Sequence, residues 1–253
     1  MRLLATLEYD GTDFRGFQFQ KRGRTVQGEI ETALTHVTRD KTRVVGAGRT
    51  DSGVHAIGQA AHFDTTWQRS LAELQRALNA VLPNDIAVVD LKQVAENFSA
   101  RYAATSRLYR YTILNQAQRA PLVDRFALIV PEPLDENAMD RAARLLIGEK
   151  DFGAFGTAPE GTNTVRVVTR AHVQRAGARV WFEIEANAFL YRMVRRIVGS
   201  LLKVGKGRQS VADFQAVLEK KRRAEIAARP NGLCLMRVQY NFSPSRENEN
   251  ILS

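Results

Sequence analysis

The same alternation of strand-like and helix-like segments occurs twice along this chain, and this repetition restricts the possible folds more than any other feature. In the first half, alternating or continuous apolar runs predict strands over 3–9, 54–63 and 86–94. Apolar residues at helical spacing predict two helices between them, over 26–37 and 71–82. Helices that lie between strands in this order indicate a sheet with helices packed against it.

The second half repeats the pattern of the first. Its expected strands cover 106–114, 165–174, 180–186 and 235–240. Its expected helices cover 134–147, 191–204 and 211–221. We therefore predict an α+β fold of two similar domains, each a mixed or antiparallel β-sheet with helices on one face. The expected boundaries are 1–105 for the first domain, 106–242 for the second and 243–253 for a polar, frayed tail.

The charge of the chain indicates a nucleic-acid partner. The sequence has 37 Lys and Arg residues against 27 Asp and Glu residues, a net charge of +10, with an ordinary 44% of hydrophobic residues. The segment 166–208 alone contains ten basic residues and two acidic ones, and a smaller basic cluster covers 21–24. Such clusters favour binding to a phosphate backbone, so we expect the second domain to carry an RNA-binding surface.

Several classes of protein are excluded by residue counts. One cysteine cannot form an intramolecular disulfide, and Glu8 interrupts the opening segment before a signal peptide's apolar core could form. No apolar run reaches the 18 or so residues of a membrane helix, so we expect a soluble, cytoplasmic protein. The four histidines and the cysteine lack metal-ligand spacing, and zinc-dependent deamination of a nucleobase would need paired cysteines. We expect no metal and no cofactor.

A loop with three glycines, residues 46–55, is the most informative segment. Its glycines predict a tight turn between two strands, with polar side chains at its crest. A dinucleotide-binding motif would need glycine where Asp51 stands, and a P-loop would need lysine where Val54 stands. The hydrolase nucleophile elbow around Ser52 would need glycines at Thr50 and Val54. None of these three motifs is therefore present.

A carboxylate beside an arginine, Asp51 and Arg49, is the chemistry that remains in this loop. At about 4 Å from a guanidinium and an effective dielectric near 20, a carboxylate gains roughly 4 kcal/mol of gross Coulomb attraction, which keeps it ionised. An ionised aspartate suits a nucleophile or a base, and does not suit an acid. The alternative from the residues alone is a surface ion pair that only holds the turn.

The loop resembles the Gly-Arg-Thr-Asp-Ala-Gly-Val-His signature of the bacterial tRNA pseudouridine synthase A family. Ser52 replaces the usual alanine, and Phe17 stands where tryptophan is common. Four further blocks resemble the family in order and spacing. They are Glu8-Tyr9-Asp10-Gly11-Thr12-Asp13-Phe14-Arg15-Gly16-Phe17-Gln18, Arg107-Leu108-Tyr109-Arg110-Tyr111, Asn187-Ala188-Phe189-Leu190 with Met193-Val194-Arg195 and Ile197-Val198-Gly199-Ser200-Leu201, and Gly232-Leu233-Cys234-Leu235.

This resemblance implies the pseudouridine synthase fold, with a catalytic cleft between the two domains. It implies an isomerase that converts uridine to pseudouridine at nucleotides 38, 39 and 40 of the tRNA anticodon stem-loop, without a cofactor. The N1–C1′ bond breaks, the uracil turns, and C5 joins C1′. Asp51 matches the catalytic aspartate, since a nearby carboxylate can stabilise or trap oxocarbenium-like charge on the sugar. Whether it attacks C1′, attacks uracil C6 or abstracts a sugar proton stays open.

Three further residues receive roles from the resemblance. Arg49 enters the space that a flipped nucleotide vacates, or braces that nucleotide; a structural partner of Asp51 is the alternative. Tyr111 matches the tyrosine that stacks on the flipped uracil, although strand alternation puts Tyr109 on the same face and a core tyrosine fits the pattern equally. Arg195, at the edge of the apolar stripe of helix 191–204, matches a basic residue that pairs with the aspartate.

The resemblance also implies a homodimer that binds one tRNA across both subunits. A non-catalytic RNA-binding module or RNA chaperone is the alternative function, because the basic surface alone would serve it. A binding module would not require a carboxylate such as Asp51 in the path of an anionic partner, which favours the enzyme.

Overall fold

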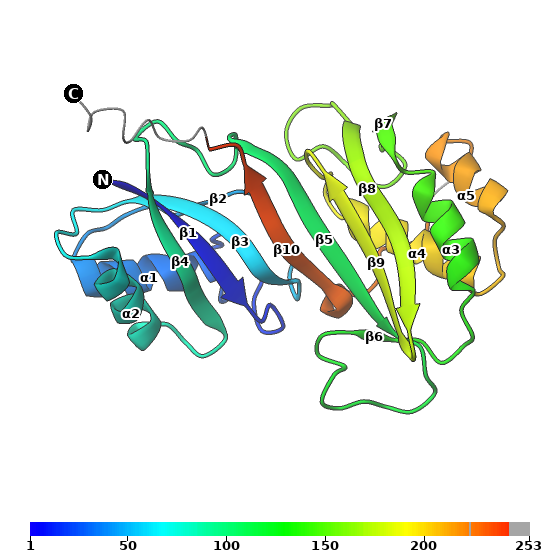
Figure 1. Cartoon of the computed structure of the whole chain (residues 1–253), viewed down its shortest axis with the longest axis horizontal. Helices are drawn as coiled ribbons and strands as arrows, with labels where there is room; N and C mark the ends of the chain where they lie inside the picture. The colour runs from blue at the N-terminus through cyan, green and yellow to red at the C-terminus, as the bar shows by residue number, and fades with distance from the viewer. Residues whose placement is uncertain (223, 243–253) are drawn as a thin grey trace, which may run out of the picture.

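The computed structural model describes residues 1–222 and 224–242, so the expected tail at 243–253 lies outside the described residues. A ten-stranded mixed sheet runs the length of the molecule in the order β4-β1-β3-β10-β5-β9-β8-β7, with β2 beside β3 and β6 beside β5 (Figure 1). The strands are β1 Arg2–Tyr9, β2 Val45–Gly46, β3 His55–Asp64, β4 Ile86–Val94, β5 Ala104–Leu114, β6 Leu128–Ile129, β7 Gly148–Asp151, β8 Val165–Ala176, β9 Arg179–Ala186 and β10 Leu233–Tyr240.

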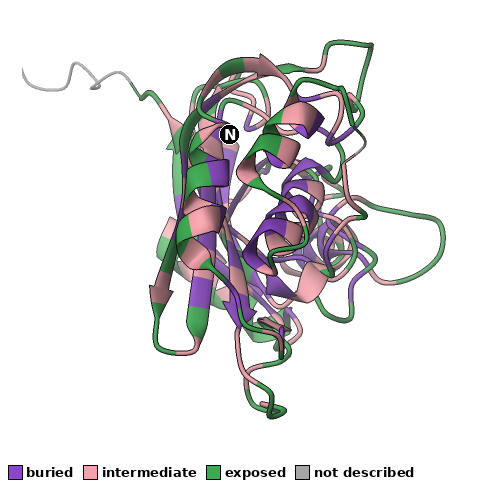
Figure 2. Cartoon of the chain, turned by 90° about the vertical axis from the view of Figure 1, so that its right-hand side faces the viewer, coloured by how far each residue is buried: buried purple, intermediate pink, exposed green. Residues whose placement is uncertain are grey.

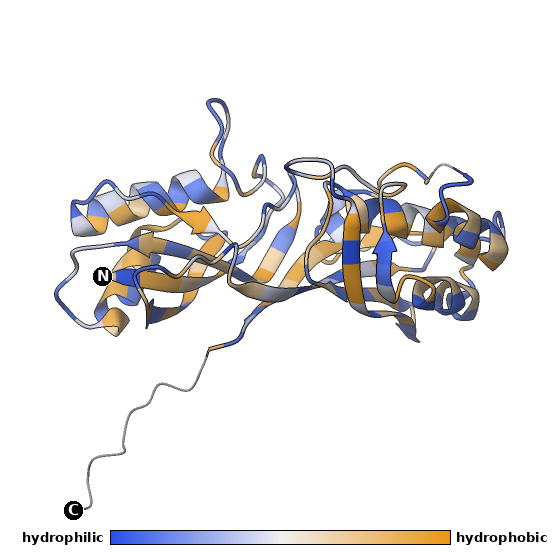
Figure 3. Ribbon diagram, turned by 90° about the horizontal axis from the view of Figure 1, so that it is seen from above, coloured by the Kyte–Doolittle hydropathy of each residue, from blue (hydrophilic) through white to orange (hydrophobic). Residues whose placement is uncertain are grey.

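Five α-helices pack against the sheet. They are α1 Val26–Thr38, α2 Leu71–Val81, α3 Glu136–Arg144, α4 Met193–Gly205 and α5 Val211–Leu218. The helices of the two halves occupy opposite ends of the molecule (Figure 3). Buried residues lie mainly between the strands and the helices, and one large apolar cluster extends through both halves (Figure 2). This arrangement confirms the predicted α+β fold.

The last strand joins the two halves into one sheet. β10 pairs in parallel with β3 through Cys234 and Leu235, and antiparallel with β5 along most of its length. Gly58 permits this close approach, since a Cβ at that position would lie 2.4 Å from the carbonyl oxygen of Met236. The sheet is therefore continuous, and the division of the chain at residues 105 and 106 stays a prediction.

The helices and long strands lie within three residues of their predicted bounds. The shift at α3 has a local cause, because the Asp135 side chain accepts a hydrogen bond from the Ala138 N–H and the helix begins after this cap, two residues beyond the expected Leu134. The short strands β2, β6 and β7 were not predicted, because two to four residues are too few to show alternation.

Candidate active site

The loop of residues 46–55 leaves β2, follows the junction of the two halves and enters β3. Its turn depends on Gly53, whose φ of 77° lies in the left-handed region that favours glycine. A Cβ there would also lie 2.8 Å from the ring of Pro230, just before β10. The two halves thus meet directly behind Asp51.

Hydrogen bonds hold almost every residue of this loop, and several of these bonds involve side chains. Arg107 on β5 donates to the Ala47 carbonyl at 2.9 Å. Next along the loop, Gln59 Nε2 donates to the Gly48 carbonyl at 3.1 Å, and Ser52 Oγ donates to the Phe14 carbonyl at 3.0 Å. Between them, the hydroxyls of Tyr9 and Thr50 share a hydrogen bond of 2.8 Å. Tyr9 and Gln59 are buried, so these bonds form away from competing water. The loop is rigidly placed before any substrate binds.

Asp51 forms an ion pair with Arg195, which lies 144 residues away in sequence. Nη1 of Arg195 donates to Oδ2 of Asp51 at 2.9 Å, and the side chains are 14% and 20% exposed respectively. Nε of the same guanidinium donates to the Ala228 carbonyl at 2.8 Å, which fixes its orientation. One oxygen of Asp51 is therefore held by a positioned cation, while the carboxylate stays accessible at the surface.

Arg49 is the exception among the loop residues. Its side chain is exposed and forms no hydrogen bond or ion pair with any residue that the structure describes. It is not the partner of Asp51, since Arg195 has that position. The guanidinium of Arg49 is thus free to contact a ligand two residues from the carboxylate.

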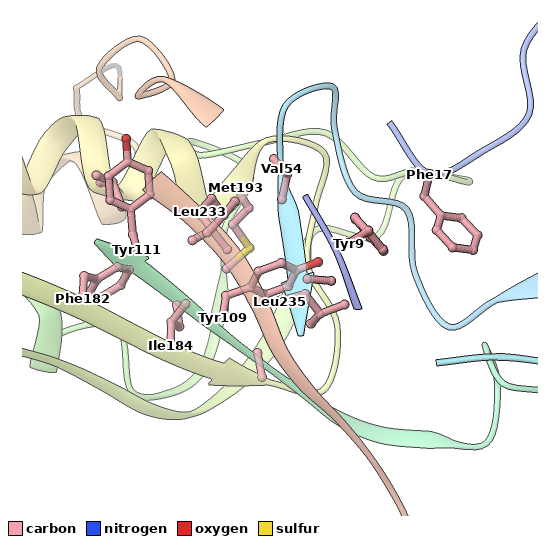
Figure 4. Close-up of a cluster of buried hydrophobic side chains, with 14 of the residues drawn as sticks. Tyr9, Phe17, Val54, Tyr109, Tyr111, Phe182, Ile184, Met193, Leu233 and Leu235 are labelled. Carbon is pink, nitrogen blue, oxygen red and sulfur yellow. The ribbon is translucent and has the colours of Figure 1, made fainter. Parts of the chain in front are cut away.

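The two tyrosines that strand alternation could not separate differ in burial. Both rings lie on the same side of β5 (Figure 4), opposite Leu235 for Tyr109 and opposite Leu233 for Tyr111. Tyr111 is 0% exposed, and its hydroxyl donates to the Arg229 carbonyl at 2.7 Å. A fully enclosed ring has no free face for a base, which argues against the stacking role predicted for Tyr111.

Tyr109 is less completely enclosed than Tyr111. It is 8% exposed, and its ring meets Phe189 edge-on with centroids 5.1 Å apart. Burial raises the pKa of the Tyr109 hydroxyl, and the negative charge of Asp51 raises it further. The structure therefore brings Asp51 and Arg195 into contact, leaves Arg49 exposed, and buries Tyr109 less completely than Tyr111.

Comparisons with known proteins agree with this geometry. The matching family model is described as a tRNA pseudouridine synthase and covers residues 5–103 and 142–241. A protein of Roseiflexus castenholzii named tRNA pseudouridine synthase A is 45% identical over 241 residues, which are 92% of this chain and 88% of that protein. The chain belongs to the tRNA pseudouridine synthase family.

Other family members align over nearly their whole length. A tRNA pseudouridine synthase A of Haemophilus ducreyi is 43% identical over 97% of this chain and 94% of its own. A tRNA pseudouridine synthase A 2 of Clostridium perfringens is 39% identical over 93% of this chain and 98% of its own.

In this member of the tRNA pseudouridine synthase family, much of the charge in the basic segment 166–208 is neutralised locally. Six of its ten basic residues form ion pairs: Arg170 with Glu183, Arg175 with Glu136, Arg195 with Asp51, Lys203 with Glu225, and Lys206 and Arg208 with Glu132. Arg192 and Arg179 are exposed and have no ion pair among the described residues. The composition of this segment therefore overstates the charge that it presents to a ligand.

In the second basic cluster, residues 21–24, some basic side chains likewise form ion pairs and others do not. Arg24 pairs with Asp85 at 2.6 Å and with Glu29 at 2.7 Å, and lies over the Phe14 ring. Lys21 and Arg22 are exposed, without an ion pair in the described part of the chain.

Sequence reasoning missed the residues that hold the loop: Tyr9, Gln59 and Arg107. The sequence does indicate a structural role for Gln59, because a glutamine in the apolar strand 54–63 needs a buried hydrogen-bond partner. The residue pattern gives no such indication for Tyr9 and Arg107, because their neighbours in sequence do not reveal which loop they contact. Within residues 1–222 and 224–242, no group of three or more acidic, histidine or cysteine side chains is arranged to hold a metal ion. No helix in these ranges has the length and apolar character that crossing a membrane requires.

Proposed function

We propose that this chain isomerises uridine to pseudouridine in tRNA, at nucleotides 38, 39 and 40 of the anticodon stem-loop. The observation that carries the proposal is the partly exposed Asp51 carboxylate, held by Arg195 at 2.9 Å on a loop that hydrogen bonds fix on both sides of it. Family membership and the names of the relatives support the same activity.

Asp51 supplies the negative charge that the reaction needs. Breaking the N1–C1′ bond builds positive charge on the sugar, which a nearby carboxylate stabilises or traps as a covalent bond. Arg195 holds Asp51 in position, because its guanidinium donates to Oδ2 of Asp51 at 2.9 Å and is itself oriented by the Ala228 carbonyl. One carboxylate is sufficient, since the uracil stays bound and is joined again through C5.

Arg49 and Tyr109 handle the nucleotide around this chemistry. Taking a nucleotide out of a stem costs a few kcal/mol. The free guanidinium of Arg49 is suited to fill the space left in the stack. We assign the contact with the flipped base to Tyr109 in place of Tyr111, because Tyr109 is 8% exposed whereas Tyr111 is fully enclosed.

Release of tritium from tRNA labelled at uracil C5 tests the activity, because C5 loses its hydrogen when it joins C1′. Wild-type protein releases tritium, and Asp51→Asn does not, although it still binds tRNA. Asp90→Asn is the matched control, because Asp90 is exposed on β4 and has no ion pair among the described residues. Equal release by Asp51→Asn and wild type would remove Asp51 from the reaction.

A non-catalytic RNA-binding module makes a different prediction: tRNA binding without tritium release from any tRNA. No observation favours it, and Asp51 argues against it, because binding a polyanion does not require a carboxylate held in place by a mostly buried arginine. We further propose that the protein works as a cytoplasmic homodimer, for which sedimentation of the free protein is the test. A single species at the monomer mass of 28.3 kDa would refute the dimer.

A further inference from the structure

Tyr102 is the most exposed aromatic residue in the described chain. It lies in the segment between β4 and β5, and 78% of its surface is exposed. Aromatic residues are usually at least half buried, because an exposed ring forgoes the large stabilisation that burial gives. An exposed aromatic ring at an ordered position therefore indicates a function for that ring.

The backbone around Tyr102 is firmly held. The Ala100 N–H donates to Nδ1 of His62 at 3.1 Å, and the Ala100 carbonyl accepts from the Tyr240 hydroxyl at 2.8 Å. Phe98 packs on Tyr240 with ring centroids 5.2 Å apart. Folding has thus already restricted this segment, so a ligand that contacts the ring does not have to order the backbone.

Arg101 places a guanidinium over the ring of Tyr102. Its guanidinium carbon lies 5.4 Å from the Tyr102 ring centroid, and Nη2 donates to Glu160 at 2.8 Å. Glu160 belongs to the segment between β7 and β8, so the second half of the molecule helps to hold Arg101 in place. An aromatic ring with an adjacent guanidinium is the combination on which nucleobases stack.

One side chain connects Arg101 and Tyr102 to the loop that carries Asp51. Nη2 of Arg107 donates to the Arg101 carbonyl at 2.8 Å and to the Ala47 carbonyl at 2.9 Å. Its Nη1 donates to the carbonyls of Ala104 and Asn187. The distance between Tyr102 and the loop is therefore fixed through a single guanidinium.

We propose that Tyr102, flanked by Arg101, is a stacking platform for an unpaired nucleobase of the RNA substrate, separate from the nucleotide that reacts at Asp51. The proposal rests on the proposed function and adds a second contact to it. The anticodon loop offers unpaired bases next to the stem that contains the target. A protein partner fits less well, since a single ring beside a charged residue is far smaller than the apolar core of a protein interface.

Binding of an anticodon stem-loop RNA with 2-aminopurine in its loop tests the platform, because stacking on an aromatic ring quenches this base. We expect Tyr102→Ala to weaken stem-loop binding about 5-fold to 150-fold and to abolish the quench. Tyr102→Phe retains both, because the ring face is kept. A duplex of the same stem without the loop binds wild type and Tyr102→Ala equally. Val89→Ala, an exposed apolar change on β4, serves as control and alters neither measurement.

Three results would overturn the platform: unchanged stem-loop binding by Tyr102→Ala, an equal loss for stem-loop and duplex, or a change of sedimentation that makes Tyr102 a contact between protein chains. These outcomes are independent of turnover. Absence of tritium release from any tRNA by wild type would refute the proposed activity, while the quench and its loss in Tyr102→Ala would still support the platform.

Discussion

In a double-mutant cycle, the ion pair between Asp51 and Arg195 should give the coupling free energy of a mostly buried contact. The cycle compares the free energies of unfolding of wild type, Asp51→Ala, Arg195→Ala and the double variant. The hydrogen bond from Arg195 to the Ala228 carbonyl is lost in both variants that lack the arginine, so the cycle cancels it. What remains is the coupling between the two charged side chains.

The structure sets the expected size of this coupling. Exposed ion pairs contribute about 0.2–1 kcal/mol, whereas hydrogen bonds to charged groups contribute about 1.5–3 kcal/mol. Asp51 and Arg195 are 2.9 Å apart and only 20% and 14% exposed, with the guanidinium already oriented. We therefore expect a coupling of about 1.5–3 kcal/mol.

Urea unfolding at pH 7 measures each free energy. The pair Lys221 and Glu219 is the control, because its atoms are 2.6 Å apart but both side chains are exposed, and its coupling should stay below about 1 kcal/mol. A coupling below about 0.5 kcal/mol for Asp51 and Arg195 would contradict the reasoning, since Arg195 would then not hold the carboxylate in solution.

Three further measurements test other parts of the structure. Gly53→Ala should lower the free energy of unfolding by at least about 1–2 kcal/mol in urea titrations, because φ is 77° and a proline ring occupies the Cβ space; an unchanged midpoint would refute this. Tyr111→Phe should cost about 0.5–1.5 kcal/mol of stability and leave tRNA binding unchanged, whereas Tyr109→Ala should lose about 1–3 kcal/mol of binding; the reverse result would restore the stacking role to Tyr111. The hydrogen bond from Lys220 lowers the pKa of Asp151 from the usual 3.8 to about 2. Ionised Asp151 therefore contributes its full stabilisation of the folded state above about pH 4, and this stabilisation is lost as pH falls toward 2. The difference in unfolding free energy between wild type and Asp151→Asn should therefore be constant above about pH 5 and shrink below pH 4; a difference independent of pH would contradict the assignment.

Most helices and strands could be predicted because their signals are local. The amphipathic spacing of 26–37 and 71–82 depends only on neighbours within a few turns, and Ser70 with Glu73 forms the capping box that marks the start of α2. The loop around Asp51 was equally readable, since the glycines that shape it lie within eight residues of one another.

The position of β10 could not be read in this way. Its alternation predicts a strand, but the same pattern fits an edge or a central place in the sheet. Only packing places Leu233 and Leu235 between the two halves, where they complete the core.

The sequence by itself therefore determined the α+β class, the positive charge and the glycine loop that presents Asp51, the residue to which we assign the chemistry. The tertiary structure decided which of two tyrosines is fully enclosed and which basic residues are neutralised by ion pairs. Tyr109 and Tyr111 have the same place in the strand pattern, yet Tyr109 is 8% exposed, whereas Tyr111 is fully enclosed and donates to the Arg229 carbonyl. The reason is physical: periodicity reports which face a side chain takes, whereas burial and ion pairing depend on residues that only folding brings into contact.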